Sequence, residues 1–338
     1  MTKERVDTGK EQKGKRGFES FSGKKAKRNY TFENMRKKNI SFVILSLPTL
    51  VWYLIFCYLP IFGILLAFKR YRLVPGKRFF YSLFASEWVG FENFRFLFLN
   101  PQMGRVVRNT LCYNLVFLIL GTIIPITLAI ILANLYSEKI RSVVQMTALL
   151  PHFISWIIVS YFVFAFLSSD RGMINAYLTQ AGADGINFYQ KPEVWPFILI
   201  FVQLWKSAGY TMILYYSYLI SINREYYDSA LVDGANNLQL IRYIILPMLR
   251  PMIVVLVLLN LGHILSTDFG LFYQVTRNSG SILSTTETID VYVYKALMVQ
   301  SNFGYSAAAS LVQNGIGAVL LLLANFGIRK ADQERGIL

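Results

Sequence analysis

Six long apolar segments constrain this chain more than any other feature of its sequence. A helix that crosses a lipid bilayer needs about 20 mostly apolar residues, and the segments that reach this length are Ser41–Phe68, Asn109–Leu135, Val143–Leu167, Trp195–Ile222, Met252–Phe272 and Ala307–Ile328. Charged residues make up only 16% of the chain, whereas soluble proteins carry about 25%. The sequence therefore predicts an all-α membrane protein with six transmembrane helices.

The distribution of basic residues predicts the direction in which these helices cross the membrane. Residues 1–40 hold 13 of the chain's 34 Lys and Arg residues, and a basic tail before an apolar span is typical of the cytoplasmic side. With both termini inside, the cytoplasmic segments 1–40, 136–142, 223–251 and 329–338 outweigh the outer ones in basic residues, 21 to 12. We therefore attribute the net charge of +15 to the orientation of the chain in the membrane, and we expect no nucleic-acid partner. Three parts are expected: a basic tail (1–40), a six-helix transmembrane region (41–330) and a cytoplasmic tail (331–338).

A polar stretch lies between the fourth and fifth apolar segments, with the sequence EYYDSALVDGANNLQLIRYIILPMLRP over residues 225–251. It resembles the EAA loop of importer permeases in the ATP-binding-cassette (ABC) superfamily. That loop has the pattern E-A-A, three residues, G, nine residues, I-x-L-P. Every spacing matches, with Asp228 in place of the Glu and Ser229 in place of the first Ala.

The resemblance implies the type I importer fold and a coupling loop at residues 223–251. In the family this loop is a short cytoplasmic helix–turn–helix that docks onto a separate ATPase. Asp228 is expected near the start of the first short helix, where the helix dipole favours a carboxylate, and Gly234 is expected at positive φ in the turn. Pro247 and Pro251 would set the start of the fifth span. The residues expected to act in coupling are Glu225, Asp228, Ser229, Ala230, Asp233, Gly234, Ala235, Ile244, Leu246 and Pro247.

Other segments are similar to the oligosaccharide and polysaccharide (maltose-type) branch of these permeases. They are Tyr58–Gly63, Trp88–Phe94, Leu150–Trp156 and Thr288–Tyr294. The resemblance implies a bacterial cytoplasmic-membrane subunit that imports oligosaccharides with a second homologous permease, two ATPase subunits and an extracellular solute-binding protein. This chain would bind no cofactor or metal, because ATP and magnesium would be held by the ATPase.

Polar residues within the spans are candidates for the substrate pathway, since such residues tend to face a cavity or another helix. Asn260, His263 and Thr267 would share one face of the fifth span, with Asp268 just beyond. Gln203 and Tyr210 would share a face of the fourth span, beside Trp205, and the sixth span offers Asn314. Such residues also join helices by hydrogen bonds, so pathway and helix contact both remain open.

Two other classes of membrane protein are alternatives to an importer. A membrane-embedded glycan- or lipid-processing enzyme would need a recognisable catalytic cluster, and an ion-driven secondary transporter would call for inverted repeats and ion ligands. The spacing of Gly9, Gly14 and Lys15 imitates a phosphate-binding loop, but Arg16 stands where Ser or Thr must bind magnesium. The chain is therefore not expected to hydrolyse ATP itself.

Overall fold

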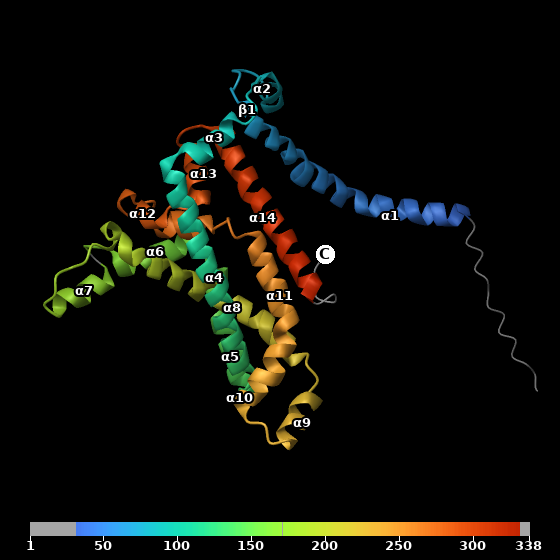
Figure 1. The fold of residues 1–338 in the computed structure, drawn as a ribbon, viewed down its shortest axis with the longest axis vertical. Helices are drawn as coiled ribbons and strands as arrows, with labels where there is room; N and C mark the ends of the chain where they lie inside the picture. Colours follow the sequence, from blue (N-terminus) through green and yellow to red (C-terminus); the bar gives the residue numbers. More distant parts are fainter. Residues whose placement is uncertain (1–31, 171, 332–338) are drawn as a thin grey trace, which may run out of the picture. The chain divides into compact units, whose positions relative to one another are not determined.

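The computed structural model describes residues 32–170 and 172–331, which are predominantly helical (Figure 1). They fall into two compact units, divided between Leu59 and Pro60. Residues 1–31 of the expected basic tail (1–40) lie outside the described residues. The same is true of residues 332–338 of the expected C-terminal tail (331–338).

The first unit is a single helical path. Helix α1 (Phe32–Tyr53) passes into a π-helical turn, η1 (Leu54–Tyr58), and the chain then enters the 3₁₀ helix η2 (Leu59–Phe68). Pro60 has no backbone N–H to donate, which explains why regular α-helix does not continue there. The apolar run Phe42–Phe68 is long enough to cross a membrane.

The second unit contains a two-stranded antiparallel sheet and most of the helices. Strand β1 (Lys69–Arg70) pairs with β2 (Glu87–Trp88). The helices are α2 (Phe79–Ala85), α3 (Glu92–Leu99), α4 (Pro101–Ala133), α5 (Glu138–Phe153), α6 (Trp156–Leu167), α7 (Met173–Gln180), η3 (Phe188–Gln190), η4 (Pro192–Val194), α8 (Trp195–Ile220), α9 (Glu225–Val232), α10 (Asn237–Leu240), η5 (Ile241–Ile245), α11 (Leu246–Gly262), η6 (Gly270–Val275), η7 (Gly280–Ile282), α12 (Leu283–Thr286), α13 (Ile289–Met298) and α14 (Phe303–Ala331).

Within the described residues, five helical runs are long and apolar enough to cross a membrane, namely Phe42–Phe68, Pro101–Ala133, Pro192–Ile220, Asn237–Gly262 and Phe303–Lys330. A sixth candidate is the pair α5 and α6, which is bent by 96°. Five of the six predicted segments therefore overlap one helical run each. The third predicted segment, Val143–Leu167, is divided between two helices.

The bend between α5 and α6 is fixed by side chains that replace the broken helix ladder. Ser155 caps the start of α6 by accepting a hydrogen bond from the N–H of Ile158 (3.4 Å). At the end of α5, Lys206 Nζ of α8 donates to the carbonyl of His152 (2.7 Å) and lies 3.3 Å from that of Pro151. A cation suits a helix C-terminus, where the free carbonyls carry partial negative charge. The break therefore depends on a residue about 50 positions away in sequence.

The fifth predicted span, Met252–Phe272, differs from the structure at both ends. Its helix begins earlier, because α10, η5 and α11 form one run over Asn237–Gly262, and it ends at Gly262. The chain then unwinds until the π-helix η6 begins at Gly270. Asn260, His263 and Thr267 therefore do not share one helical face, and this prediction is wrong for Thr267.

Side chains from three other helices bind the backbone of the unwound segment 263–268. Asn114 of α4 donates to the carbonyls of Ile264 and Ser266 (2.8 and 3.0 Å). Gln313 of α14 donates to the carbonyl of Leu265 (2.8 Å), and Asp290 of α13 accepts from the N–H of Thr267 (2.6 Å). Non-helical backbone is tolerated in a membrane protein where protein groups satisfy it in this way.

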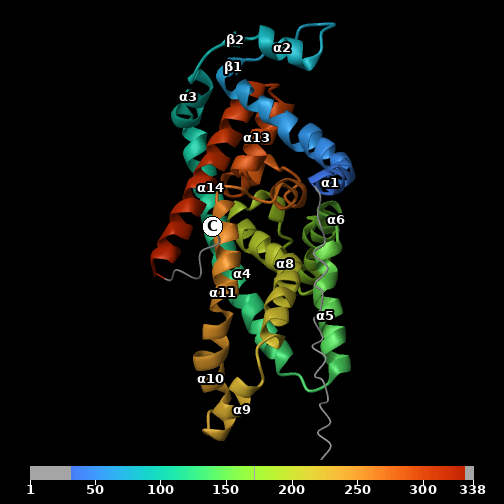
Figure 2. The same cartoon turned by 90° about the vertical axis from the view of Figure 1, so that its right-hand side faces the viewer.

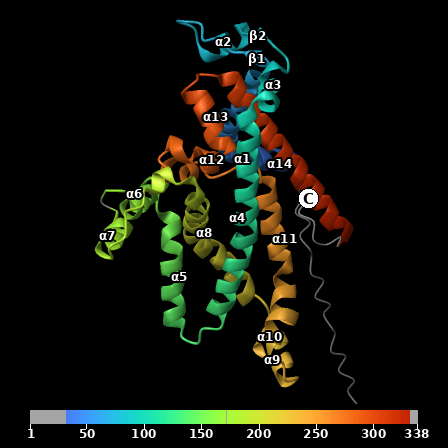
Figure 3. The same ribbon diagram turned by 60° about the vertical axis from the view of Figure 1, so that its left-hand side comes forward.

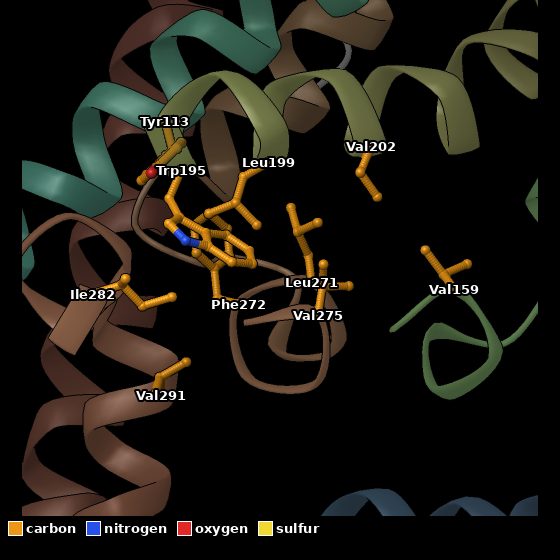
Figure 4. Close-up of a cluster of buried hydrophobic side chains, with 10 residues drawn as sticks. All are labelled: Tyr113, Val159, Trp195, Leu199, Val202, Leu271, Phe272, Val275, Ile282 and Val291. Carbon is orange, nitrogen blue, oxygen red and sulfur yellow. The ribbon is translucent and has the colours of Figure 1, made fainter. Parts of the chain in front are cut away.

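Helix α8 packs against both α4 and α5 (Figures 2 and 3). Gly209 permits the approach to α5, because a Cβ at this position would overlap the carbonyl of Ala148. At the start of α8, a buried cluster around Trp195 and Leu199 joins Phe272 and Val275 of η6 (Figure 4). This core holds η6 against the start of α8.

Candidate coupling loop and polar cavity

The segment between α8 and α11 forms a helix–turn–helix, as the resemblance predicted. Helices α9 and α10 are joined by a turn in which Gly234 has φ = +80°, so the expected positive φ is confirmed. Asp228 lies in the first turn of α9, also as expected. A β-branched residue at Gly234 would be strained, because left-handed backbone costs such residues about 1–3 kcal/mol.

Local hydrogen bonds define both loop helices. The side chain of Asn223 accepts from the N–H of Glu225 (3.2 Å) at the start of α9. Asn236 and Gln239 form a reciprocal capping box at the start of α10, with distances of 2.8 and 2.9 Å. Such caps contribute about 1 kcal/mol each. The loop therefore takes its shape from its own sequence.

The loop presents apolar side chains at its surface. No residue of α9 is buried, and Val232 and Leu238 are 88% and 73% exposed. Tyr227 of α9 is partly buried. It packs against a buried cluster of α4, α8 and α11 and thereby joins α9 to the spans. Burial raises the pKa of its hydroxyl. An exposed apolar patch beside an anchored turn is typical of a surface that meets another protein.

A cavity of about 400 Å³ lies between α4, α8 and α11 and is closed on one side by the unwound segment 263–268. Its wall is formed by Asn114, Phe117, Leu118, Gly121 and Thr122 of α4, by Gln203, Leu204, Ser207, Tyr210, Thr211, Leu214 and Tyr215 of α8, by Leu256, Leu259 and Asn260 of α11, and by His263, Ser266 and Asp268. The size falls within the range of ordinary small-ligand pockets.

The chemistry of this wall is polar but contains few charges. It holds amides, hydroxyls and aromatic rings, with one carboxylate (Asp268), one imidazole (His263) and neither Lys nor Arg. Gln203 Oε1 is buried and accepts no hydrogen bond from the described residues. A buried acceptor without a partner loses free energy, so a ligand hydroxyl that donates to it would bind favourably.

A network beside the cavity connects the two broken spans. The Lys206 ammonium lies 5.1 Å from the centroid of the Trp156 ring, and the Trp156 indole N–H donates to Asp268 Oδ2 (2.7 Å). The ring of His152 stacks on Tyr210 with centroids 4.5 Å apart. The bend of the third span, the fourth span and the unwound part of the fifth are therefore joined through these side chains.

The structure gathers five of the eight residues predicted for the pathway: Gln203, Tyr210, Asn260, His263 and Asp268 all line the cavity. Three do not line it. Thr267 instead bonds Asp290 and Thr288, Asn314 is exposed and bonds the Ser310 carbonyl of its own helix, and Trp205 is 41% exposed. The side chains of Thr267 and Asn314 therefore form hydrogen bonds with residues that do not line the cavity.

Sequence reasoning missed the contribution of α4. Asn114, Gly121 and Thr122 line the cavity, and their spacing of seven and eight residues places them on one helical face. That spacing was the available signal. It was weak because Gly and Thr are frequent wherever membrane helices pack closely.

The carboxylates of Glu287 and Asp290 each have structural partners. Asp290 accepts from Thr267 and Gln313. Glu287 pairs with Lys295 at 3.0 Å and with Arg105 at 3.4 Å, and is only 7% exposed at its side chain. These groups join α4, α13 and the unwound segment.

Residues 121–330 match the family model described as binding-protein-dependent transport system inner membrane component. The chain belongs to this family. The permease is thus a membrane component of a binding-protein-dependent transporter. It is 32% identical over 291 residues to the polygalacturonan/rhamnogalacturonan transport system permease protein YteP of Bacillus subtilis (strain 168), covering 86% of this chain and 88% of the relative.

Two solved structures are similar to the permease in both fold and sequence. One is a bacterial ABC transporter involved in the import of the acidic polysaccharide alginate, with a TM-score of 0.78, 34% identity and coverage of 89% of this chain and 98% of the other. The second is a bacterial alginate ABC transporter in complex with an alginate pentasaccharide-bound periplasmic protein, with a TM-score of 0.77, 33% identity and coverage of 88% and 97%. The permease therefore has the fold of an ABC importer subunit.

Proposed function

We propose that this permease imports oligosaccharides into the cytoplasm with energy from a separate ATPase. The observation that carries the proposal is the combination, in one chain, of a helix–turn–helix loop with exposed apolar residues and a polar cavity lined by amides, hydroxyls and rings. The names of the relative and of the similar structures add support, because they refer to the transport of polysaccharides.

The coupling loop, residues 223–251, transmits the movement of the ATPase to the spans. Val232, Leu238 and their neighbours dock into the ATPase, which holds ATP and magnesium. Because α10, η5 and α11 are one helical run to Gly262, displacement of the loop moves Asn260 at the wall of the cavity. A rigid-body shift of this kind biases the permease between inward-facing and outward-facing states.

Within the cavity, sugar hydroxyls exchange hydrogen bonds with Asn260 and Gln203, while the sugar's C–H face packs on the ring of Tyr210. Asn114 accepts from a hydroxyl through its amide oxygen, since its N–H groups bind the Ile264 and Ser266 carbonyls. Amides suit hydroxyl groups because each amide offers both donors and an acceptor. The small number of fixed charges suits a pathway, since a ligand must leave as readily as it enters.

The remaining parts of the importer are a second homologous permease, two ATPase subunits and an extracellular solute-binding protein. Exposed apolar residues on the long helices, such as Phe197 at 76% and Phe326 at 70%, suit contact with lipid or with the second permease. Both termini and the coupling loop lie in the cytoplasm, and the six spans include the bent pair α5–α6.

Reconstitution of the whole importer tests this function. Vesicles that contain this permease, its partner permease and the ATPase subunits, with the binding protein outside, should accumulate a labelled oligosaccharide only when ATP is enclosed. A non-hydrolysable ATP analogue is the matched control and should support no accumulation. Uptake that follows an imposed ion gradient without ATP would refute the proposal, as would chemical conversion of the sugar without transport.

A further inference from the structure

A second hollow, of about 330 Å³, lies between α6 and the turn that follows η6. It shares no lining residue with the cavity between α4, α8 and α11. Its polar wall includes Ser160, Tyr161, Tyr273, Gln274, Arg277 and Asn278. We refer to it as the Arg277 site.

The turn that carries this site is strained and firmly held. Arg277 and Asn278 have φ values of 54° and 49°. Asparagine tolerates this left-handed region, whereas it costs a residue such as Arg277 about 1–3 kcal/mol. The hydrogen bonds that fix the turn include those from the Arg277 N–H to the Gln274 carbonyl (3.1 Å) and from Thr276 Oγ1 to the Phe272 carbonyl (2.7 Å). Phe272 belongs to the buried cluster of Figure 4. The core therefore holds the strained Arg277 in place.

The charge of Arg277 is available to a ligand. Its guanidinium lies 4.0 Å from the centroid of the Phe164 ring, and no carboxylate of the described residues forms an ion pair with it. Burial raises the pKa of the nearby Tyr189 to about 12, against the opposing effect of Arg277, so this hydroxyl is neutral at physiological pH and does not compensate the charge. An arginine placed over an aromatic ring keeps its planar donors free for a carboxylate.

The other groups of the site match the remaining parts of a sugar. Asn278 Oδ1 is buried and accepts no hydrogen bond from the described residues. The amide of Gln274 supplies donors and an acceptor beside it, and the rings of Tyr161 and Tyr273 offer apolar surfaces. Hydroxyl groups need the amides, and the C–H face of a pyranose needs a ring.

We propose that the Arg277 site is a binding subsite for a uronic acid residue of the transported oligosaccharide. Arg277 binds the carboxylate, Asn278 and Gln274 bind hydroxyls, and a tyrosine ring packs against the sugar. The proposal rests on the oligosaccharide function proposed above and adds to it a preference for acidic sugars. Because the cavity between α4, α8 and α11 has no Lys or Arg, the Arg277 site supplies the anion selectivity of this subunit.

Sugar binding to the complete permease–ATPase complex in nanodiscs, without the binding protein, tests the subsite directly. The probes are trigalacturonic acid and galactotriose, which differ only in the carboxylates, and saturation-transfer NMR measures both dissociation constants. We expect the acid to bind about tenfold more tightly than the neutral sugar, which corresponds to about 1.4 kcal/mol. Arg277→Gln should abolish this difference, and Arg277→Lys should keep part of it.

Two further variants separate the roles within the site. Asn278→Gly keeps the positive φ without strain and removes the acceptor, so it should weaken binding of both sugars by a similar factor. Arg72→Gln removes an exposed cation elsewhere and should change neither. The subsite is refuted if Arg277→Gln leaves binding of the acid unchanged, or if it weakens both sugars equally, which would indicate damage to the turn. If wild-type complex binds galactotriose but not the acid, the subsite fails and the oligosaccharide function stands. If it binds neither sugar and the reconstituted importer transports none, both fail.

Discussion

The coupling loop and the wall of the cavity are built in opposite ways. The loop is held by contacts between near neighbours, such as Asn223 with Glu225 and Asn236 with Gln239. The cavity wall is held by contacts between distant residues, such as Asn114 with Ile264 and Lys206 with His152. The coupling loop can therefore keep its shape while the spans around the cavity rearrange, because few of the loop's hydrogen bonds depend on the spans.

We expect the largest loss of stability where α8 packs directly against the backbone of α5. Gly209→Ala would place a Cβ against the Ala148 carbonyl and force α8 away from α5, at a cost of about 3 kcal/mol. The thermal unfolding temperature of the purified complex should fall by several degrees. Gly315→Ala is the matched control, since a Cβ there meets open space, and it should leave the temperature unchanged or raise it. Equal unfolding temperatures of the two variants would contradict the importance assigned to this helix contact.

A change confined to the loop should spare the spans. Gly234→Val introduces strain of about 1–3 kcal/mol at φ = +80° and should abolish uptake and weaken co-purification of the ATPase, with normal membrane expression. Gly234→Asn is the control, because Asn tolerates left-handed backbone, and should retain most activity. Uptake at the wild-type rate by the valine variant would remove the role assigned to this turn.

The bend of the third span should depend on Lys206. Lys206→Met removes the donor to the His152 and Pro151 carbonyls. The Pro151 carbonyl keeps the Ile154 N–H as a donor, and the loss of a partner at the His152 carbonyl costs about 1–3 kcal/mol. We expect a lower unfolding temperature and a reduced rate of sugar uptake. Lys206→Arg keeps a cation at the helix end and should be milder. A methionine variant as stable and active as wild type would show that the bend needs no cap.

The smallest effect is expected from single residues of the cavity. Asn260→Ala and Tyr210→Ala should raise the sugar concentration for half-maximal stimulation of ATP hydrolysis about tenfold, an effect of about 1.4 kcal/mol. Basal hydrolysis should persist because the loop is untouched. Asn314→Ala is the control, since this exposed residue bonds within its own helix. Loss of assembly with an unchanged sugar response would make Asn260 and Tyr210 helix contacts instead.

The same contrast explains how much could be predicted from the sequence. The loop could be predicted, because the residues of the EAA-like pattern, among them Asp228 and Gly234, follow one another at fixed short spacings in the sequence. The breaks after Phe153 and Gly262 could not, because the groups that satisfy them lie far away in sequence, on α8, α4, α13 and α14. Thr267 was misplaced for this reason, and Asn114 was missed.

Five basic residues run against the expected excess of positive charge inside, because they lie in a segment that is expected outside: Lys69, Arg70, Arg72, Lys77 and Arg78. The fold gives two of them structural partners. Lys69 Nζ donates to the carbonyl of Leu83 (2.9 Å), near the end of α2, and Arg70 pairs with Glu92 at 2.7 Å. A count of basic residues does not detect such pairing, so cysteine labelling tests the orientation more directly.

Accessibility of a cysteine at Asp233 tests the central claim most directly, namely that the loop is a cytoplasmic docking element. Cys57 and Cys112 are both exposed and are first replaced by Ser, and Asp184→Cys serves as the outer control. A membrane-impermeant maleimide should label Asp184→Cys on intact cells. It should label Asp233→Cys only in inside-out vesicles, and less when the ATPase is bound. Labelling of Asp233→Cys on intact cells would contradict the account.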